Sequence, residues 1–244
     1  MEAFDVNLSR LRFISSCNGA ELDGASGYLR PVLPPEDRPV LHFTHLRNLP
    51  GILDRGFLMC DRFVRADGIL QVECADHEIK ARRRSRKVDV PPGGVVADYV
   101  PFYFAPRSPM LYKINKGAVS TYADGQDPLV YLVSTPRRLL GAGCPSVFSD
   151  GNCAADISVL ENEPGRLADH VDWAVMRQAR WNNTGDDPDR MRRRMAEFLV
   201  HERVPVSAFA ELAVRTPARA REVRRLLPHG LRRLPVAVRP SWYY

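Results

Sequence analysis

Short apolar segments of strand length, separated by turns and short helices, constrain the fold of this chain more than any other feature. They follow one another without the regular strand–helix–strand alternation that builds a parallel sheet. The pattern therefore predicts a single α+β domain over most of the chain. Its predicted strands are residues 40–45, 99–104, 129–134, 196–204, 211–214 and 234–238.

The first 37 residues differ from the rest of the 244-residue chain. Turn dipeptides and prolines punctuate them, and no periodic apolar stretch exceeds a few residues. We therefore expect residues 1–37 to form a loosely ordered N-terminal extension, and residues 38–244 to form one domain.

The charge of the chain is basic and carried almost entirely by arginine. Of 35 positive residues only four are lysine, and the formal net charge is +6. Such a charge permits an anionic partner without requiring one. A GC-rich genome, which favours arginine codons, explains the general excess equally well.

The cysteines and the apolar runs indicate a compartment. Five cysteines are present with no Cys-x-x-Cys pair, so neither a disulfide framework nor a zinc site is expected, and we predict no bound metal. No apolar run approaches the ~20 residues of a membrane span, and residues 1–12 lack the pattern of a signal peptide. We expect a cytoplasmic, monomeric protein.

Two of the predicted strands carry side chains that suit a reaction. His42 and Thr44 share one face of the first predicted strand, although a strand histidine is more often a structural residue. Glu197 lies in an otherwise apolar strand with Phe198, Leu199 and Val200, where an unpaired carboxylate costs several kcal/mol to bury. Glu197 is therefore expected to be partnered or to line a cleft, unless its strand is an exposed edge.

Arginines gather in two further segments. Residues 80–87 contain six cations in eight positions, too dense for a neutral solvated face. Arg190, Arg192, Arg193 and Arg194 directly precede the strand of Glu197. Both segments could bind phosphate, since arginine makes bidentate phosphate contacts, and a solvated or partner-binding helix is the alternative.

Read together, these segments resemble the DarT family of bacterial toxins, which ADP-ribosylate DNA. The likeness runs in order from about residue 38 to the C-terminal Tyr-Tyr. Residues 1–37 match nothing in the family. The blocks that carry it are His42-Phe43-Thr44-His45 with Asn48-Leu49-Pro50-Gly51-Ile52, Tyr99-Val100-Pro101-Phe102-Tyr103-Phe104 with Arg107-Ser108-Pro109-Met110-Leu111-Tyr112, Ser149-Asp150-Gly151-Asn152, and Ala196-Glu197-Phe198-Leu199-Val200 with Val204-Pro205.

The resemblance implies the ADP-ribosyltransferase fold, in which a split, mixed β-sheet forms a cleft surrounded by short helices and holds NAD, the co-substrate. In similar enzymes a first-strand histidine, a second-strand aromatic residue and a late-strand glutamate act together. Glu197 matches the glutamate that drives transfer. The residues that the resemblance implies in NAD binding are His42, Phe43, Thr44, Gly51 and Tyr103.

The resemblance also implies a functional arginine before the second of these strands. Its pattern of Ile, Lys, two residues and Arg matches Ile79-Lys80 and places it at Arg83, with Arg82 and Arg84 as alternative registers. In the thymidine-modifying branch the acceptor is thymine N3 of single-stranded DNA, which must lose its proton. Arginine stays protonated, so we expect Arg83 to polarise a thymine carbonyl or to hold the NAD diphosphate.

The loop before Glu197 is where the fold usually contacts its acceptor, and the resemblance implies a macrodomain antitoxin, DarG, as partner. Three alternatives stay open: a guanine-directed DNA transferase, a catalytically inactive module that binds DNA or NAD, and a transferase for protein or RNA ends. The residues predicted to contact DNA are Trp181, Asn182, Arg190, Arg193 and Arg194.

Overall fold

A computed structural model describes residues 20–22, 29–31 and 33–244. The chain divides into two compact units, Met1–Pro34 and Pro35–Tyr244. In the first unit β1 (Ala20–Leu22) pairs antiparallel with β2 (Leu29–Pro31). The loose order expected of residues 1–37 concerns residues that lie mostly outside the described part of the chain.

The second unit is built on a mixed eight-stranded sheet, counted over the described residues, in the order β12-β11-β6-β3-β5-β9-β7-β8. Only β11 and β12 pair in parallel; the other neighbours are antiparallel. A separate ribbon pairs β4 with β10. The strands are β3 (Val40–His45), β4 (Phe57–Met59), β5 (Tyr99–Tyr103), β6 (Leu129–Ser134), β7 (Ser146–Asn152), β8 (Leu160–Glu161), β9 (Ala196–His201), β10 (Arg203–Pro205), β11 (Glu211–Val214) and β12 (Val236–Val238).

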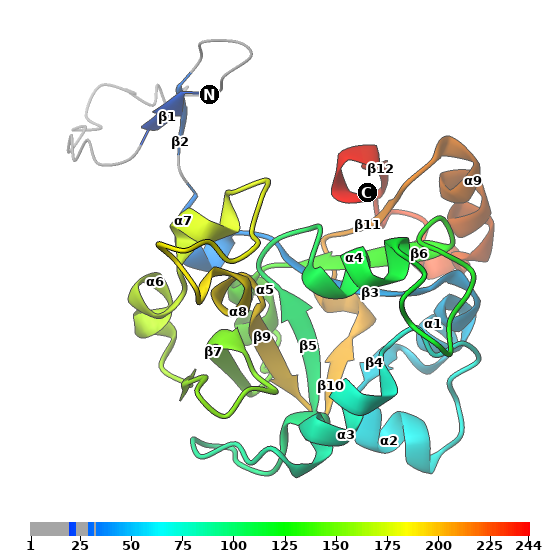
Figure 1. The fold of residues 1–244 in the computed structure, drawn as a ribbon. Coiled ribbons are helices and arrows are strands. Elements are labelled where there is room, and N and C mark those ends of the chain that lie inside the picture. Colours follow the sequence, from blue (N-terminus) through cyan, green and yellow to red (C-terminus); the bar gives the residue numbers. More distant parts are fainter. Residues whose placement is uncertain (1–19, 23–28, 32) are drawn as a thin grey trace, which may run out of the picture. The chain divides into compact units, whose positions relative to one another are not determined.

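The sheet is split between β3 and β5. These two strands share a single paired position, Leu41 opposite Tyr103, and β5 runs steeply across the direction of β3 and β6 (Figure 1). A proline inside a strand, such as Pro101, predicts an edge strand or a bulge, because it has no N–H to donate. An edge position is wrong, because β5 is an inner strand. The split explains the proline, since Tyr103 is the one described position of β5 that pairs with β3, and at Pro101 there is no ladder to β3 for a missing N–H to interrupt.

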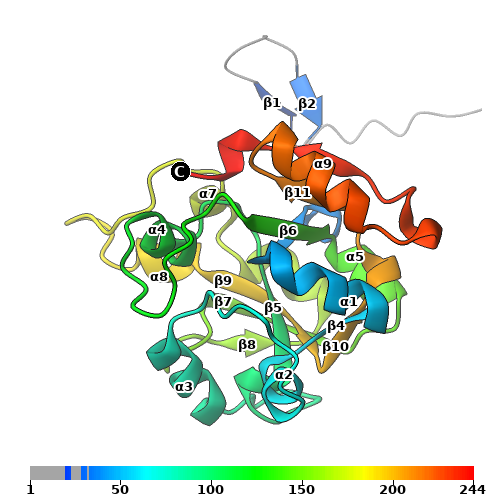
Figure 2. The same ribbon diagram turned by 90° about the vertical axis from the view of Figure 1, so that its right-hand side faces the viewer.

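Short helices connect the strands. Figure 2 shows α9 beside β11 and α1 near β4, on the half of the sheet that contains β3. No described helix combines the length and apolarity needed to cross a membrane. The helices are α1 (Leu49–Arg55), α2 (Asp61–Ala66), α3 (His77–Ser85), α4 (Pro109–Asn115), α5 (Pro136–Gly141), α6 (Leu167–His170), α7 (Trp173–Met176), α8 (Arg190–Arg194) and α9 (Pro217–Leu226).

The two faces of the sheet are packed differently. One face carries a continuous core across both halves, including Val40, Phe102 and Phe198. The opposite face carries two separate cores, one around Leu41 and one around Leu199. The second face is therefore interrupted where the strands diverge.

Some local predictions need correction. Residues 60–77, whose sequence is polar and poorly patterned, nevertheless contain α2, and the helical pattern of residues 173–181 gives a helix only as far as Met176. The strand expected over residues 196–204 is broken into β9 and β10 at Glu202, whose φ of 60° is unusual for a residue with a side chain.

Asn48 stands at the N-cap of α1, where asparagine before a proline-containing first turn predicts a cap, but its side chain makes no capping hydrogen bond. The Nδ2 of Asn48 instead donates to Thr44 Oγ1 at 3.0 Å and to the Val72 carbonyl at 2.8 Å. Its Oδ1 accepts from the backbone N–H groups of Gln71 and Val72. Asn48 thus fastens a distant chain segment to β3, which a local sequence pattern does not reveal. The end of α1 is as expected, since Gly56 adopts a φ of 74° there.

Candidate active site

A pocket of about 390 Å³ lies where the sheet splits. It takes His42 and Thr44 from β3, Tyr103 from β5 and Glu197 from β9, together with Arg83 from α3. His42 and Glu197 belong to opposite faces of the sheet by strand alternation, and both reach the pocket because the strands separate there. The structure therefore brings together the first-strand, second-strand and late-strand residues predicted from the sequence.

Glu197 is 1% exposed and paired with Arg83. The Nη1 of Arg83 donates to Oε1 at 3.0 Å and to Oε2 at 2.9 Å. The expectation that this carboxylate is partnered is confirmed, and an exposed edge strand is excluded. A buried ion pair of this kind is costly to desolvate, so it is more easily explained by chemistry than by stability.

The arrangement of α3 separates the three candidate arginines. Asp76 caps the helix by accepting from the N–H groups of Glu78 and Ile79. Arg82 is exposed, and Arg84 donates to Asp61 at 3.0 Å. Arg83 alone of the three meets Glu197. Its Nη2 is buried and has no hydrogen-bond partner among the described residues.

His42 is held in one tautomer. Its Nδ1 lies 2.8 Å from the Pro101 carbonyl oxygen, and burial lowers the pKa of His42 to about 4. The ring is therefore neutral near pH 7, and because a carbonyl oxygen only accepts, Nδ1 carries the proton. Nε2 is left as an acceptor. Phe102 packs against the ring, with centroids 5.8 Å apart.

The aromatic residues lie at different depths. Tyr103 stands opposite Glu197 in the β5–β9 ladder and lines the pocket; burial raises the pKa of its hydroxyl, which is therefore protonated. Phe43 also lines the pocket and packs edge-on against Tyr131. Gly51 does not line it: this glycine lies in α1, where its carbonyl accepts from Arg55. Direct contact of Gly51 with a ligand is thus not supported.

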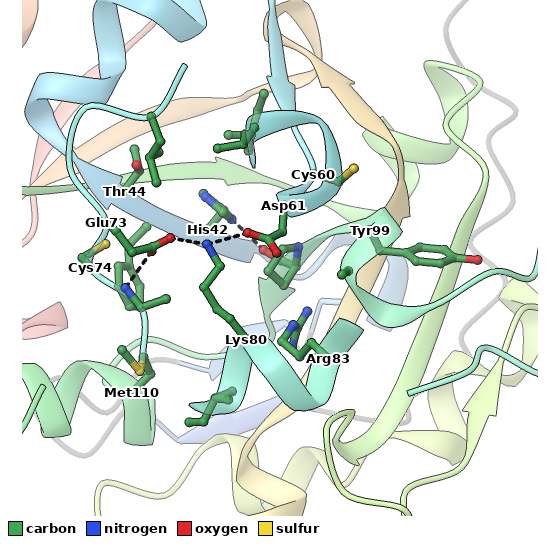
Figure 3. A pocket seen from close by; sticks show the side chains of 18 of the residues that line it. His42, Thr44, Cys60, Asp61, Glu73, Cys74, Lys80, Arg83, Tyr99 and Met110 are labelled. Carbon is green, nitrogen blue, oxygen red and sulfur yellow. Dashed lines mark hydrogen bonds and ion pairs between the residues drawn. The ribbon is translucent and has the colours of Figure 1, made fainter. Parts of the chain in front are cut away.

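One wall of the pocket is formed by ion-paired lysines and carboxylates that were not predicted from the sequence. Lys80 on α3 lies between two carboxylates, paired with Asp61 at 2.5 Å and with Glu73, as Figure 3 shows. Lys113 of α4 pairs with Asp76 nearby. Asp61, Glu73 and Asp76 lie in the poorly patterned residues 60–77. In the sequence, only the dense cations of residues 80–87 indicated that acidic side chains pack against α3.

The arginines before Glu197 are less available than expected. Arg194 is 5% exposed, and its guanidinium donates to the carbonyls of Met176 at 2.6 Å and Pro106 at 2.7 Å. This burial contradicts a DNA contact by Arg194. Arg193 pairs with Asp172 and, at 2.5 Å, with Asp187, so its charge is committed internally.

The rest of this segment remains accessible. Asn182 is exposed, while Trp181 is partly exposed and donates to the Tyr244 hydroxyl at 3.1 Å. Arg190 is partly exposed and its Nε has no hydrogen-bond partner in the described part of the chain. From α8 and its end, Met191 and Met195 line the pocket, which the sequence did not indicate.

Among the described residues, no group of three or more His, Cys, Asp or Glu side chains is arranged to hold a metal ion. Cys60, Cys74, Cys144 and Cys153 are buried free thiols.

Comparisons with known proteins agree with this geometry. The family model described as ssDNA thymidine ADP-ribosyltransferase, DarT, matches residues 41–244. A DNA ADP-ribosyl transferase of Thermus sp. (strain 2.9) is 38% identical over 212 residues, covering 86% of this chain and 98% of the relative. The structure of Thermus sp. 2.9 DarT in complex with ADP-ribosylated ssDNA matches with a TM-score of 0.79 at 38% identity, covering 86% of this chain and 98% of that one. The same protein in complex with NAD⁺ gives a TM-score of 0.74 at 36% identity, covering 86% and 99%.

The mixed sheet with a pocket at its split matches the solved DarT structures, so the predicted ADP-ribosyltransferase fold is confirmed. The chain belongs to the DarT family. It is an NAD-dependent DNA ADP-ribosyltransferase, with NAD as co-substrate.

Proposed function

We propose that this enzyme transfers ADP-ribose from NAD to thymidine bases of single-stranded DNA, as the toxin of a toxin–antitoxin pair. The observation that carries the proposal is the buried contact between Arg83 and Glu197 in a pocket also lined by His42, Thr44 and Tyr103. The description of the matching family model and the DNA product in the Thermus complex support the acceptor.

In the reaction, the bond between nicotinamide and ribose C1′ breaks with its electrons leaving on nicotinamide. A bond from thymine N3 to C1′ forms, and N3 gives up its proton to solvent water. The glycosidic cleavage develops positive charge on the ribose. We assign Glu197 to hold a ribose hydroxyl and face this charge, because a fixed carboxylate stabilises the transition state more than the ground state.

We assign Arg83 a double role. Its Nη1 orients Glu197, and its Nη2, unpartnered among the described residues, can donate to an incoming oxygen. The two candidate acceptors are a thymine carbonyl, whose polarisation acidifies N3, and a phosphate oxygen of NAD. His42 Nε2 is an acceptor for a hydroxyl of the co-substrate, and Tyr103 supplies an aromatic surface for nicotinamide.

The proposal is tested with NAD labelled in its adenylate part and four homopolymer oligonucleotides. We expect label on oligo(dT) alone, with duplexed dT poorly modified because N3 is occupied in the base pair. Label on oligo(dG) would assign the guanine-directed activity instead, and label on protein or RNA ends with none on DNA would overturn the DNA acceptor. Glu197→Gln is the matched inactive control.

The partner is tested separately. We propose that a macrodomain antitoxin removes the modification, as the family resemblance implies. Incubating labelled oligo(dT) with a purified DarG-type macrodomain should release the label, and expression of this chain alone should arrest bacterial growth. Retained label and unimpaired growth would argue against a toxin–antitoxin role.

A further inference from the structure

The two carboxylate oxygens of Glu197 are held differently. Both accept from Arg83 Nη1, but only Oε1 is also contacted by a second side chain, the thiol of Cys153, at 2.8 Å. Cys153 lies in the turn directly after β7 and is 1% exposed. Oε2 therefore keeps an acceptor position that Oε1 has used.

The direction of this contact follows from the charge state of Cys153. Burial raises the pKa of the thiol well above its ordinary value, so the sulfur carries its proton. A protonated thiol donates to the Glu197 carboxylate, while the sulfur lone pairs accept from Arg83 Nη1 at 3.0 Å. Cys153 thus bridges the two members of the ion pair.

The position of Cys153 is fixed by the strand that precedes it, β7. The β7–β9 register shifts between Phe148 and Asn152, and within that shift Ser149 Oγ accepts the Glu197 backbone N–H at 3.0 Å. Ser149 in turn donates to the Gly151 carbonyl at 2.6 Å. Any side chain at Gly151 would collide with the Arg192 guanidinium, which packs over this turn. The strand β7 thus holds the main chain of Glu197 through Ser149, and the turn that follows holds its side chain through Cys153.

We propose that Cys153 is a positioning residue of the transferase: its thiol anchors Oε1 of Glu197 and thereby reserves Oε2 for the ribose hydroxyl. This inference rests on the role proposed for Glu197. A carboxylate anchored on one oxygen stays aligned with the ribose as positive charge develops there, so the contact stabilises the transition state and acts on the rate of transfer more than on NAD affinity.

Three variants test the effect on the reaction. Cys153→Ala removes the donor and should lower kcat about tenfold while leaving the KM for NAD within about twofold. Cys153→Ser keeps a donor and should restore most of the loss. Cys144→Ala, which removes another buried thiol outside the pocket, should match the wild type. Equal kcat values in the wild type and Cys153→Ala, or equal losses in Cys153→Ala and Cys153→Ser, would overturn the proposal.

The contact itself is tested without activity, by the infrared S–H stretching band of the folded full chain. The Cys153 band is assigned from the difference between wild type and Cys153→Ser. We expect it at lower frequency than the bands of the other thiols, and we expect Glu197→Gln, a weaker acceptor, to move it to higher frequency. A band that Glu197→Gln leaves in place would overturn the contact. A chain inactive on every oligonucleotide that still showed the shift would refute the proposed function and leave the thiol contact standing.

Discussion

At the scale of single residues, the pocket is defined by groups whose charge states are fixed by burial. Glu197 is held by Arg83 and by its neighbours from β7, so its carboxylate is presented in one orientation. His42 is neutral and Tyr103 is protonated. The Arg83–Glu197 ion pair therefore supplies the charge in this part of the pocket. Substitutions of these two residues should change the rate of transfer more than the affinity for NAD.

Glu197→Gln is expected to lower kcat for DNA modification about 10²–10³-fold, the loss typical of removing one preorganised electrostatic group, and to leave NAD binding largely intact. The amide keeps the shape of the side chain but not its charge. Single-turnover labelling and NAD titration measure the two effects. Glu211→Gln, which changes a carboxylate on β11 paired with Arg239, is the control and should be unaffected. Transfer at the wild-type rate by Glu197→Gln would remove Glu197 from the mechanism.

Arg83→Lys distinguishes the two roles assigned to Arg83. If Nη2 holds a thymine carbonyl, the substitution makes N3 less acidic, and the rising limb of the pH–rate profile moves to higher pH. If Nη2 holds the diphosphate, the profile stays in place and the KM for NAD rises. Arg82→Lys, at an exposed neighbour on α3, should change neither quantity. A variant with an unchanged profile and an unchanged KM contradicts both roles.

His42 makes a prediction about stability. Burial holds the pKa of His42 at about 4 in the folded chain, against about 6.5 when unfolded, so the unfolded chain binds more protons between these values. The contribution is complete above pH 6.5 and is lost as the pH falls towards 4, by up to about 3 kcal/mol. Denaturant unfolding at several pH values should show a steeper acid loss for the wild type than for His42→Gln. Equal slopes would mean that His42 is not buried in its neutral form.

At the scale of elements, the predictable parts are those whose own residues determine them. The apolar runs of β3, β6 and β11 are local signals, and each was predicted as a strand from the sequence. Contacts between distant segments were not. The side chain of Asn48 binds residues 23 and 24 positions away, and Cys153 meets Glu197 across 44 positions. Asparagine is favoured at helix N-caps, but the side chain of Asn48 makes tertiary hydrogen bonds instead of a capping bond.

Asn48→Ala tests the segment that Asn48 fastens to β3. The substitution removes the amide bonds to Thr44 and to the backbone of Gln71 and Val72, leaving buried groups without partners. We expect the free energy of unfolding to fall by about 2 kcal/mol or more. Since Val72 lines the pocket, the KM for NAD should also rise.

Hydrogen exchange gives the local measurement for this variant. The amides of Gln71 and Val72 should exchange faster in Asn48→Ala than in the wild type. Asn162→Ala, which removes one exposed hydrogen bond to Pro91, serves as the control. Unchanged exchange at these two amides would show that other contacts hold the segment in place.

At the scale of the whole molecule, the net charge of +6 overstates the positive surface near the pocket. Arg83, Arg192 and Arg193 are neutralised by carboxylates, and Arg194 is enclosed by backbone carbonyls. The sequence gives only the number of cations; which of them stay in solvent depends on acids brought in from distant segments, such as Asp150 and Asp172. A surface that binds DNA can therefore use fewer arginines than residues 80–87 and 190–194 contain.

The salt dependence of DNA binding tests this distribution of charge. Binding of oligo(dT) should weaken steeply with salt, and log K should fall linearly with log salt by about 0.7 for each phosphate neutralised. Arg190 is partly exposed and has no ion-pair partner among the described residues, whereas Arg193 is paired with Asp172 and Asp187. Arg190→Gln should therefore reduce the slope by about 0.7, and Arg193→Gln should leave it unchanged. Fluorescence anisotropy between low and physiological salt measures both slopes. A slope near zero in the wild type would argue against a DNA track, and a reduced slope in Arg193→Gln would show that its acidic partners release it to the DNA.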